Sequence, residues 1–303
     1  MVSYQGLLEI LKRNGLKKSD LTEKVGLSSR TIAKISKGEK LAAGVMKRLC
    51  AYFVCAQEDI CREVSDNNIL QVLREEKDAK VSGGLYHETQ IRLTYNSSRI
   101  EGSTLSEEQT RLIFETNTID AANGIPVDDI IETVNHFRAV DYVIDCAEKL
   151  LTEEIIKELH KILKTGTKAS YLSWFNVGDY KKRANVVGGL ETTAPSKVAE
   201  EMKVLLEDYN GKREVTIEDI SEFHCRFERI HPFQDGNGRV GRLICFKECL
   251  RYKIVPFIIE DRGKMFYYRG LREWSSERGF LIDTCLDGQD AYKALLKYFE
   301  IDF

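Results

Sequence analysis

The sequence has 303 residues, 43% of them hydrophobic and only four of them proline, a composition that favours a folded, helix-rich protein over a disordered one. It contains no apolar run of about 18 residues and no signal-peptide core, so the protein is expected to be soluble and cytoplasmic, with no membrane partner. The net charge is −3, yet residues 1–48 hold eleven Lys and Arg against four Asp and Glu. A basic first sixth joined to an acidic remainder predicts separate partners for the two parts.

Three short helices are predicted in the basic N-terminal segment. Apolar residues at 7–11 begin the first helix, and a second helix over 18–25 stops at Gly26. Ser28 is placed to cap a third helix, which ends near Gly38.

Residues 21–32, with the sequence LTEKVGLSSRTI, resemble the helix-turn-helix of Cro/repressor-type DNA-binding domains. The resemblance implies that polar side chains of the third helix face the major groove of DNA, namely Ser28, Ser29, Arg30, Thr31 and Lys34. Residues 1–62 are therefore predicted to form a helix-turn-helix domain that binds DNA. A small helical bundle whose basic face binds a protein is the alternative that the charge leaves open.

A polar connector is predicted at residues 63–84, helical around 68–77 and ended by two glycines. The remainder, residues 85–303, is predicted to form one large helical domain. A long helix is expected in it from Val127 to Leu151, because apolar residues recur there at helical spacing.

The segment 231–242, HPFQDGNGRVGR, holds a histidine, a carboxylate, two glycines around an amide, and two arginines. Helices are expected on both sides, one starting at Thr216 and one opening near Gly238. The glycines can turn backbone N–H groups toward one point, where a helix N-terminus favours an anion. The arginines suit phosphate oxygens, the carboxylate suits Mg²⁺ and the histidine suits a proton. These residues predict a polyphosphate site with a general base beside it.

The pattern His-Pro-Phe-x-Asp-Gly-Asn-Gly-Arg-x-x-Arg resembles the signature of Fic-domain proteins, which transfer AMP from ATP to protein hydroxyls. The resemblance implies an all-α, mainly helical fold with a small β-hairpin flap. It also implies that His231 is the catalytic base and that Asp235 binds Mg²⁺. The phosphates of ATP would be bound by the remaining signature residues, namely Gly236, Asn237, Gly238, Arg239 and Arg242.

The segment 97–102, with Ser97, Glu101 and Gly102 in the pattern SxxxEG, resembles the inhibitory motif that many Fic proteins carry on a helix beside the active site. The resemblance implies that Glu101 pairs with Arg242 and excludes a terminal phosphate. A helix end with a surface glutamate is the alternative reading of these residues alone.

Two more segments are similar to features of Fic proteins. Residues at about 180–189 look like the flap, whose strand edge can hold a target segment, with nucleotide contacts from Val186, Val187 and Gly188. Tyr267 and Tyr268 resemble the aromatic pair that lines the nucleotide site. Ser275 departs from the family there, because an Asn often stands at this position.

The function implied is autoinhibited transfer of AMP from ATP to a Ser, Thr or Tyr hydroxyl of a target protein or of the chain itself. Three alternatives stay open. A kinase reaction is disfavoured, because the relatives that resemble it carry Lys at the position of Gly238. The other two are transfer of a different phosphate-linked group, and a transcription regulator that uses the Fic domain to sense ATP. The sequence leaves open whether the protein is a homo-oligomer.

Overall fold

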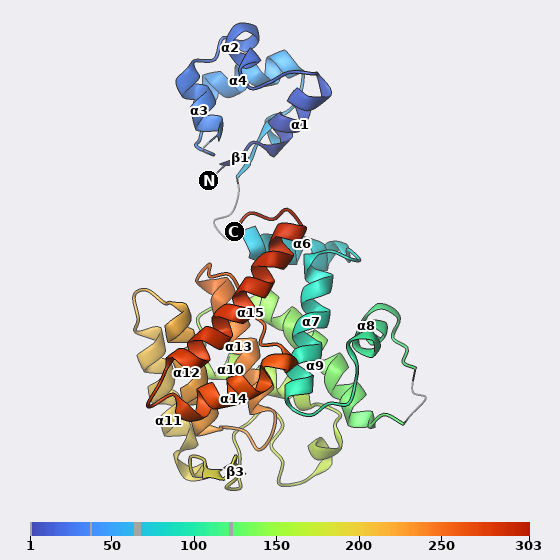
Figure 1. The fold of residues 1–303 in the computed structure, drawn as a ribbon, viewed down its shortest axis with the longest axis vertical. Helices are drawn as coiled ribbons and strands as arrows, with labels where there is room; N and C mark the ends of the chain where they lie inside the picture. The colour runs from blue at the N-terminus through green and yellow to red at the C-terminus, as the bar shows by residue number, and fades with distance from the viewer. Residues whose placement is uncertain (1, 37, 64–67, 121–123) are drawn as a thin grey trace. The chain divides into compact units, whose positions relative to one another are not determined.

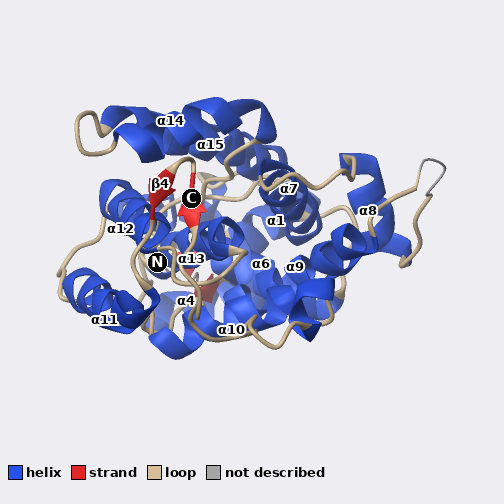
Figure 2. Ribbon diagram, turned by 90° about the horizontal axis from the view of Figure 1, so that it is seen from below, coloured by secondary structure: helices blue, strands red, loops and turns tan. Residues whose placement is uncertain are grey.

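The computed structural model describes residues 2–36, 38–63, 68–120 and 124–303. The chain divides into two compact units, residues 1–68 and residues 69–303, each with its own hydrophobic core. Helices dominate both units, as predicted, and the described strands form two short antiparallel pairs (Figure 2). No helix in the described part of the chain is long and apolar enough to cross a membrane.

The first unit is a small bundle of short helices, drawn in blue in Figure 1. Its elements are β1 (Val2–Ser3), α1 (Gln5–Arg13), α2 (Asp20–Val25), α3 (Ser29–Ser36), α4 (Ala43–Phe53), α5 (Gln57–Ile60) and β2 (Arg62–Glu63). Gly26 adopts φ 70° after α2, a left-handed conformation that ends the helix and turns the chain. The predicted cap of α3 is present, because the Ser28 hydroxyl accepts a hydrogen bond from the Thr31 N–H at 3.2 Å.

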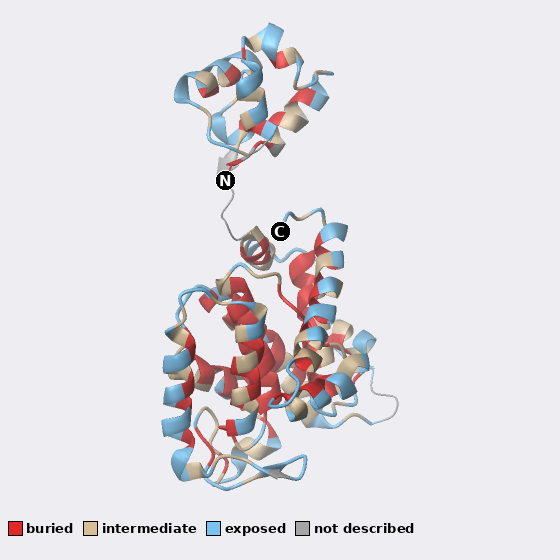
Figure 3. Ribbon diagram, turned by 60° about the vertical axis from the view of Figure 1, so that its left-hand side comes forward, coloured by how far each residue is buried: buried red, intermediate tan, exposed pale blue. Residues whose placement is uncertain are grey.

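The second unit is a larger helical body. Its helices are α6 (Asn68–Ala79), α7 (Leu85–Ile100), α8 (Glu107–Thr116), α9 (Val127–Cys146), α10 (Glu153–Lys164), α11 (Pro195–Asn210), α12 (Ile217–Ile230), α13 (Asn237–Arg251), α14 (Lys264–Glu273) and α15 (Gly279–Tyr298). Its short elements are the 3₁₀ helices η1 (Lys168–Tyr171) and η2 (Asp261–Gly263) and the strands β3 (Val186–Val187) and β4 (Leu190–Glu191). Helix α13 is buried over nearly its whole length, which places the start of this helix deep in the unit (Figure 3).

Helix α6 lies in the segment expected to be a connector, and its apolar face packs into the core of the second unit. Ile69, Leu70 and Leu73 are all buried there. Arg74 fixes the helix further, because it donates to the carbonyl of Ile144 at 3.3 Å. Residues 64–67 of the expected connector lie outside the described residues.

Helix α9 ends at Cys146, so the predicted end at Leu151 is wrong. A partner distant in sequence accounts for the difference. The buried ammonium group of Lys247, on α13, donates to the carbonyls of Ala147 at 3.2 Å and Lys149 at 2.6 Å. These bonds satisfy carbonyl groups that a continuing helix would have used.

The hairpin spans residues 186–191, so it begins six residues after the start of the predicted range of about 180–189. Its strands are β3 and β4, with Val187 opposite Leu190. Gly188 and Gly189 make the turn with φ 58° and φ 81°, the two positive angles that a tight hairpin turn of this kind requires. The chain before β3 bonds elsewhere, because the N–H of Lys181 donates to the carbonyl of Pro232 at 2.9 Å.

Candidate functional site

The signature segment joins the end of α12 to the start of α13. His231 caps the end of α12 at φ 50°, a left-handed conformation that is uncommon for a residue with a side chain. Gly236 stands at the N-cap of α13 at φ 84° and provides no side-chain cap. The side chain of Asn237 closes the loop through two hydrogen bonds to the backbone of Phe233. Its Oδ1 accepts from the N–H of Phe233 at 2.8 Å, and its Nδ2 donates to the carbonyl of Phe233 at 2.9 Å. The loop therefore presents the base and an uncapped helix N-terminus within six residues of one another.

His231 is held in its neutral form. Burial lowers its pKa to about 4, helped by the charge of Lys181 and opposed by the carbonyl of Glu228 and the charges of Glu101 and Asp235. At neutral pH the imidazole therefore carries a proton on only one of its two nitrogens. The other nitrogen can accept a proton, as a general base must.

Glu101 lies at the start of α13. Its carboxylate accepts a hydrogen bond from Arg242 at 2.8 Å, and Arg242 is 4% exposed. A Cβ on Gly238 would stand 2.1 Å from the same carboxylate oxygen, so the absence of a side chain at 238 is what admits the carboxylate. Arg242 also donates to the hydroxyl of Ser97 at 3.0 Å and to its carbonyl at 2.9 Å. Glu101 is also the C-cap residue of α7, so the segment ends a helix and places the carboxylate on Arg242, while inhibition by Glu101 stays a prediction.

Asp235, Lys164, Glu132 and Arg239 form a second charged cluster, which we call the four-charge cluster. Lys164 donates to Asp235 at 2.6 Å, and Glu132 accepts hydrogen bonds from both Lys164 and Arg239. Burial would raise the pKa of Asp235, but Lys164 and Arg239 lower it to about 2. Asp235 is therefore ionised. Arg239 is held by the carboxylate of Glu132, which belongs to α9.

Glu132 neutralises two buried cations, so we expect Glu132→Gln to lower the free energy of unfolding by about 3–5 kcal/mol, the range for breaking a buried ion pair. Denaturant unfolding of the full chain measures the change. Glu158→Gln is the matched control, because Glu158 pairs with Lys161 at the surface and should contribute less than about 1 kcal/mol. Equal, small changes in both variants would contradict the expectation and show that Asp235 alone compensates the two cations.

The flap strand β3 is open to solvent, with Val186 62% and Val187 45% exposed, as an edge that receives another chain must be. Lys181 links the two ends of the flap hairpin to the end of α12, just before the signature segment. Its ammonium group donates to the side chains of Asn185 at 2.8 Å and Thr192 at 2.6 Å and to the carbonyl of Ile230 at 3.3 Å. Burial lowers the pKa of Lys181 to about 8.

The two tyrosines differ in their surroundings. Tyr267 is 1% exposed, and its hydroxyl accepts from Arg242 at 3.3 Å, so it supports the arginine from within the core. Tyr268 is 39% exposed and donates to the carbonyl of Ile100 at 2.9 Å, next to Glu101. Ser275 accepts a hydrogen bond from Arg229 at 2.9 Å.

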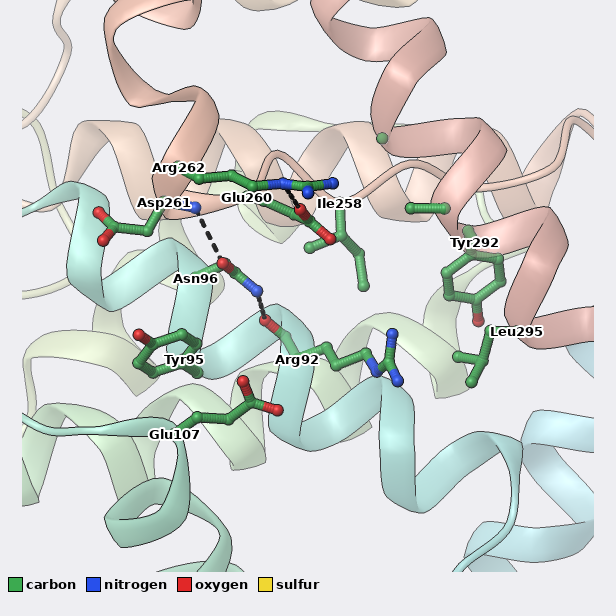
Figure 4. Close-up of a pocket in the computed structure, with 12 residues that line it drawn as sticks. Arg92, Tyr95, Asn96, Glu107, Ile258, Glu260, Asp261, Arg262, Tyr292 and Leu295 are labelled. Atoms are coloured by element: carbon green, nitrogen blue, oxygen red, sulfur yellow. Dashed lines mark hydrogen bonds and ion pairs between the residues drawn. The ribbon is translucent and has the colours of Figure 1, made fainter.

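A pocket of about 410 Å³ lies between α7, η2 and α15. Figure 4 shows Arg92 and Arg262 lining it together with Glu107, Glu260 and Asp261. Across it, Asn96 accepts a hydrogen bond from the N–H of Asp261 at 2.9 Å (Figure 4). This bond fixes the last turn of α7 to the segment that leads into α14.

Four of the five residues expected to contact DNA lie at the start of α3, and Lys34 lies in its last turn. Ser29 and Arg30 are exposed, whereas the hydroxyls of Ser28 and Thr31 bond each other at 2.9 Å. Lys34 lies 3.8 Å from Glu39 with its side chain 42% exposed. Among the described residues, the cap thus engages two of the five side chains, and Ser29 and Arg30 are the exposed ones without a contact of their own.

Comparison with known families assigns both units. The model of the Fic/DOC family matches residues 150–248, which include the whole signature segment. The second unit carries a Fic domain. The Cro/C1-type helix-turn-helix DNA-binding domain matches residues 6–66, so the first unit is a helix-turn-helix domain.

Relatives and solved structures agree with this assignment. The chain is 27% identical over 218 residues to the protein adenylyltransferase Fic of Aedes aegypti, covering 70% of this chain and 40% of the relative. It is 28% identical over 183 residues to the protein of the same name in Drosophila melanogaster, covering 59% of this chain and 36% of the relative. The chain thus spans less than half the length of these curated relatives.

The Fic fold is found among solved structures. Fic-1 from C. elegans (residues 134–508) matches with a TM-score of 0.62 at 19% identity, covering 96% of this chain and 98% of that one. A Fic-domain-containing signalling protein from Bacteroides thetaiotaomicron matches with a TM-score of 0.58 at 24% identity, covering 78% of this chain and 94% of that one.

Three residues of the Fic domain site were not predicted from the sequence: Glu132, Lys164 and Lys181. Glu132 and Lys164 come from α9 and α10, about 100 and 70 positions before the signature arginine and aspartate that they contact. Each sits in an ordinary helical pattern, where a charged residue predicts only a solvated face. The one available signal for Lys181 is its place just before the flap.

Proposed function

We propose that this chain is a protein adenylyltransferase, which transfers AMP from ATP to a Ser, Thr or Tyr hydroxyl of a target protein or of the chain itself. The curated relatives with this name support the proposal. The observation that carries it is the position of Glu101. A carboxylate of the chain itself lies at the uncapped start of α13 and receives a hydrogen bond from Arg242, so the site already holds an anion.

In the proposed complex, the triphosphate takes the place of that carboxylate. The N–H groups at Gly236, Asn237 and Gly238 bind the α-phosphate, because the first turn of a helix has unsatisfied donors. Arg239 and Arg242 bind the β- and γ-phosphates. Tyr268 lies beside the site, and the flap residues 186–188 cover the nucleotide and hold the target.

His231 acts as the general base of the transfer. Its Nε2 atom takes the proton of the hydroxyl, and the hydroxyl oxygen forms a bond to the α-phosphorus of ATP. The bond from the α-phosphorus to the bridging oxygen breaks, and pyrophosphate leaves. A general base supplies about 10²–10⁴ of the rate, and placement by the arginines and the helix start supplies much of the rest.

Asp235 fits a Mg²⁺ ligand. It is an ionised carboxylate beside the phosphate-binding loop, and Mg²⁺ is commonly held by one or two carboxylates together with substrate phosphates. When bound, Mg²⁺ would neutralise charge on the phosphates. The described residues contain no group of three or more His, Cys, Asp or Glu that would hold a metal by themselves.

Incorporation of label separates the proposed reaction from its rivals. With Mg²⁺ and a candidate target, label from α-³²P ATP should enter protein and label from γ-³²P ATP should not. The opposite pattern would establish a kinase. Transfer of another phosphate-linked group would leave both labels unincorporated, and intact-mass measurement with other nucleotides would find it.

The helix-turn-helix unit supports a second activity, binding of duplex DNA by a regulator that responds to ATP. We expect the affinity of the full chain for duplex DNA to fall steeply with salt, because each phosphate neutralised releases counterions. Arg30→Ala and Lys34→Ala should each reduce the slope of log affinity against log salt by about one. Lys47→Ala, exposed on α4, is the matched control and should leave the slope unchanged. Absence of any duplex binding at low salt would assign this unit to a protein partner.

A further inference from the structure

Three polar side chains lie in a row along one side of α12. His224, Glu228 and His231 are spaced four and three residues apart, which puts them on one face of the helix. Nδ1 of His224 and Oε1 of Glu228 have no hydrogen-bond partner among the described residues, and Nδ1 of His231 meets the backbone carbonyl of Glu228 only outside good hydrogen-bond geometry. Buried polar atoms are nearly always paired, so a row of three such atoms calls for a physical reason.

Gly241 of α13 makes room for this row. A Cβ at this position would stand 2.6 Å from Nδ1 of His224 and 2.9 Å from Oε1 of Glu228. The two atoms therefore converge on one point between the helices. Glu228 Oε2 lies 3.9 Å from Nδ1 of His231, which is longer than a formed hydrogen bond. Catalytic hydrogen bonds are often this long before the substrate binds.

The direction of the hydrogens in the row is fixed from its far end. Arg242 is a donor only, and it donates to the hydroxyl of Tyr267 at 3.3 Å. The Tyr267 hydroxyl is buried, so its own hydrogen needs an acceptor, and Nε2 of His224 lies 2.7 Å away. Burial lowers the pKa of His224 to about 3, so the ring is neutral. Its one hydrogen is then on Nδ1, which faces Glu228.

Glu228 is left as the acceptor of the row. We propose that Glu228 is a positioning residue for the base: its carboxyl oxygens accept Nδ1–H of His224 and Nδ1–H of His231. This keeps the hydrogen of His231 on Nδ1 and leaves Nε2 free to take the proton of the target hydroxyl. The inference rests on the proposed function, in which His231 is the base.

Glu228 is also joined to the inhibitory pair by this row. Burial, together with the charge of Glu101, raises the pKa of Glu228 to about 8 against the opposing charge of Arg242. In the proposed arrangement the two donated hydrogen bonds lower this pKa, since hydrogen bonds to a carboxylate favour its ionised form. Arg242, which binds Glu101, also donates to Tyr267 at the far end of the row that leads to the base.

The test compares Glu228→Gln with Glu222→Gln in the full chain. Glutamine keeps the shape of Glu228 but must offer an N–H to one of the two rings. Glu222 is on the same helix, 3.7 Å from Lys212 at the surface, and serves as the matched control. The first readout is the tautomer of His231, measured by ¹⁵N NMR of imidazole-labelled protein, with the five histidines assigned by single substitutions.

We expect Nδ1–H on His231 in the unmodified protein and in Glu222→Gln, and a shift to Nε2–H in Glu228→Gln. The second readout is kinetic: Glu228→Gln should lower kcat for AMP transfer by about 10²-fold with the KM for ATP unchanged, within what a base contributes. Two results would overturn the proposal. One is an Nε2–H tautomer of His231 in the unmodified protein, and the other is an Nδ1–H tautomer that persists in Glu228→Gln. The tautomer is measured without turnover, so absence of AMP transfer from every variant would reject the proposed function alone.

Discussion

Glu101→Gly should raise AMP transfer, including self-modification, far more than it tightens the binding of ATP. Glu101 and Arg242 are joined at 2.8 Å, and the carboxylate lies where the proposed triphosphate binds. ATP that binds beside an intact pair would have its γ-phosphate misplaced, and an error of about 1 Å can reduce a rate ~10²-fold. Rates of label incorporation at saturating ATP, with ATP affinity measured separately, give the result. A hundredfold gain would correspond to about 2.7 kcal/mol in favour of the inhibited state.

Arg242→Ala is the control for this result. It removes the same ion pair but also a partner of the γ-phosphate, so it should not activate the enzyme. Glu101→Gln is a milder control, because it keeps the length of the side chain while removing the charge that Arg242 binds. Equal activation by Glu101→Gly and Arg242→Ala would mean that the pair is only structural and that Glu101 does not compete with ATP.

His231→Ala should abolish transfer while ATP binding and the fold persist. The loss expected for the base is about 10²–10⁴-fold, and label incorporation measures it. His231→Asn is the better-matched variant, because asparagine tolerates the left-handed conformation at φ 50°. Both variants should unfold within a few degrees of the unmodified chain. Undiminished incorporation by either would remove His231 from the mechanism.

The pH dependence gives a further check on His231. Its pKa is lowered to about 4, so the ring is neutral, and competent as a base, above that value. The acid limb of kcat/KM that belongs to His231 should therefore lie near 4. A limb near 6.5, the ordinary value for histidine, would show that the base is exposed in the free enzyme.

Local chemistry was predictable from the residues themselves, whereas the long-range contact between Glu101 and Arg242 was expected only through the resemblance to a known family. The start of α12 was expected at Thr216, and the capping box of Thr216 with Asp219 is present. Such signals are read within four residues. The end of α9 was placed at Leu151 because nothing near Cys146 indicates that Lys247, a hundred residues later, takes the next carbonyls. Burial of a charged side chain depends on a partner that the local pattern does not contain.

The candidate site divides in the same way. The signature segment concentrates its residues in twelve positions, so the sequence alone could indicate a phosphate site there. Glu132 and Lys164 hold Arg239 and Asp235 from other helices, and Glu228 stands behind the base in an unremarkable helical pattern. These residues act on the signature groups from distant positions in the sequence. A single sequence does not indicate which distant residues lie close together.

The contact between Glu101 and position 238 restricts the order in which this domain can change by mutation. Any side chain larger than hydrogen at 238 would collide with the carboxylate oxygen, 2.1 Å from its Cβ. A chain that keeps Glu101 in this place is therefore favoured to keep glycine at 238, since any other residue would force the Glu101 side chain to move. One that has already lost the glutamate can sample larger residues there, and a later return of glutamate at 101 would meet an occupied site. Positions 101 and 238 are therefore expected to change in a preferred order, although each single step is a small substitution.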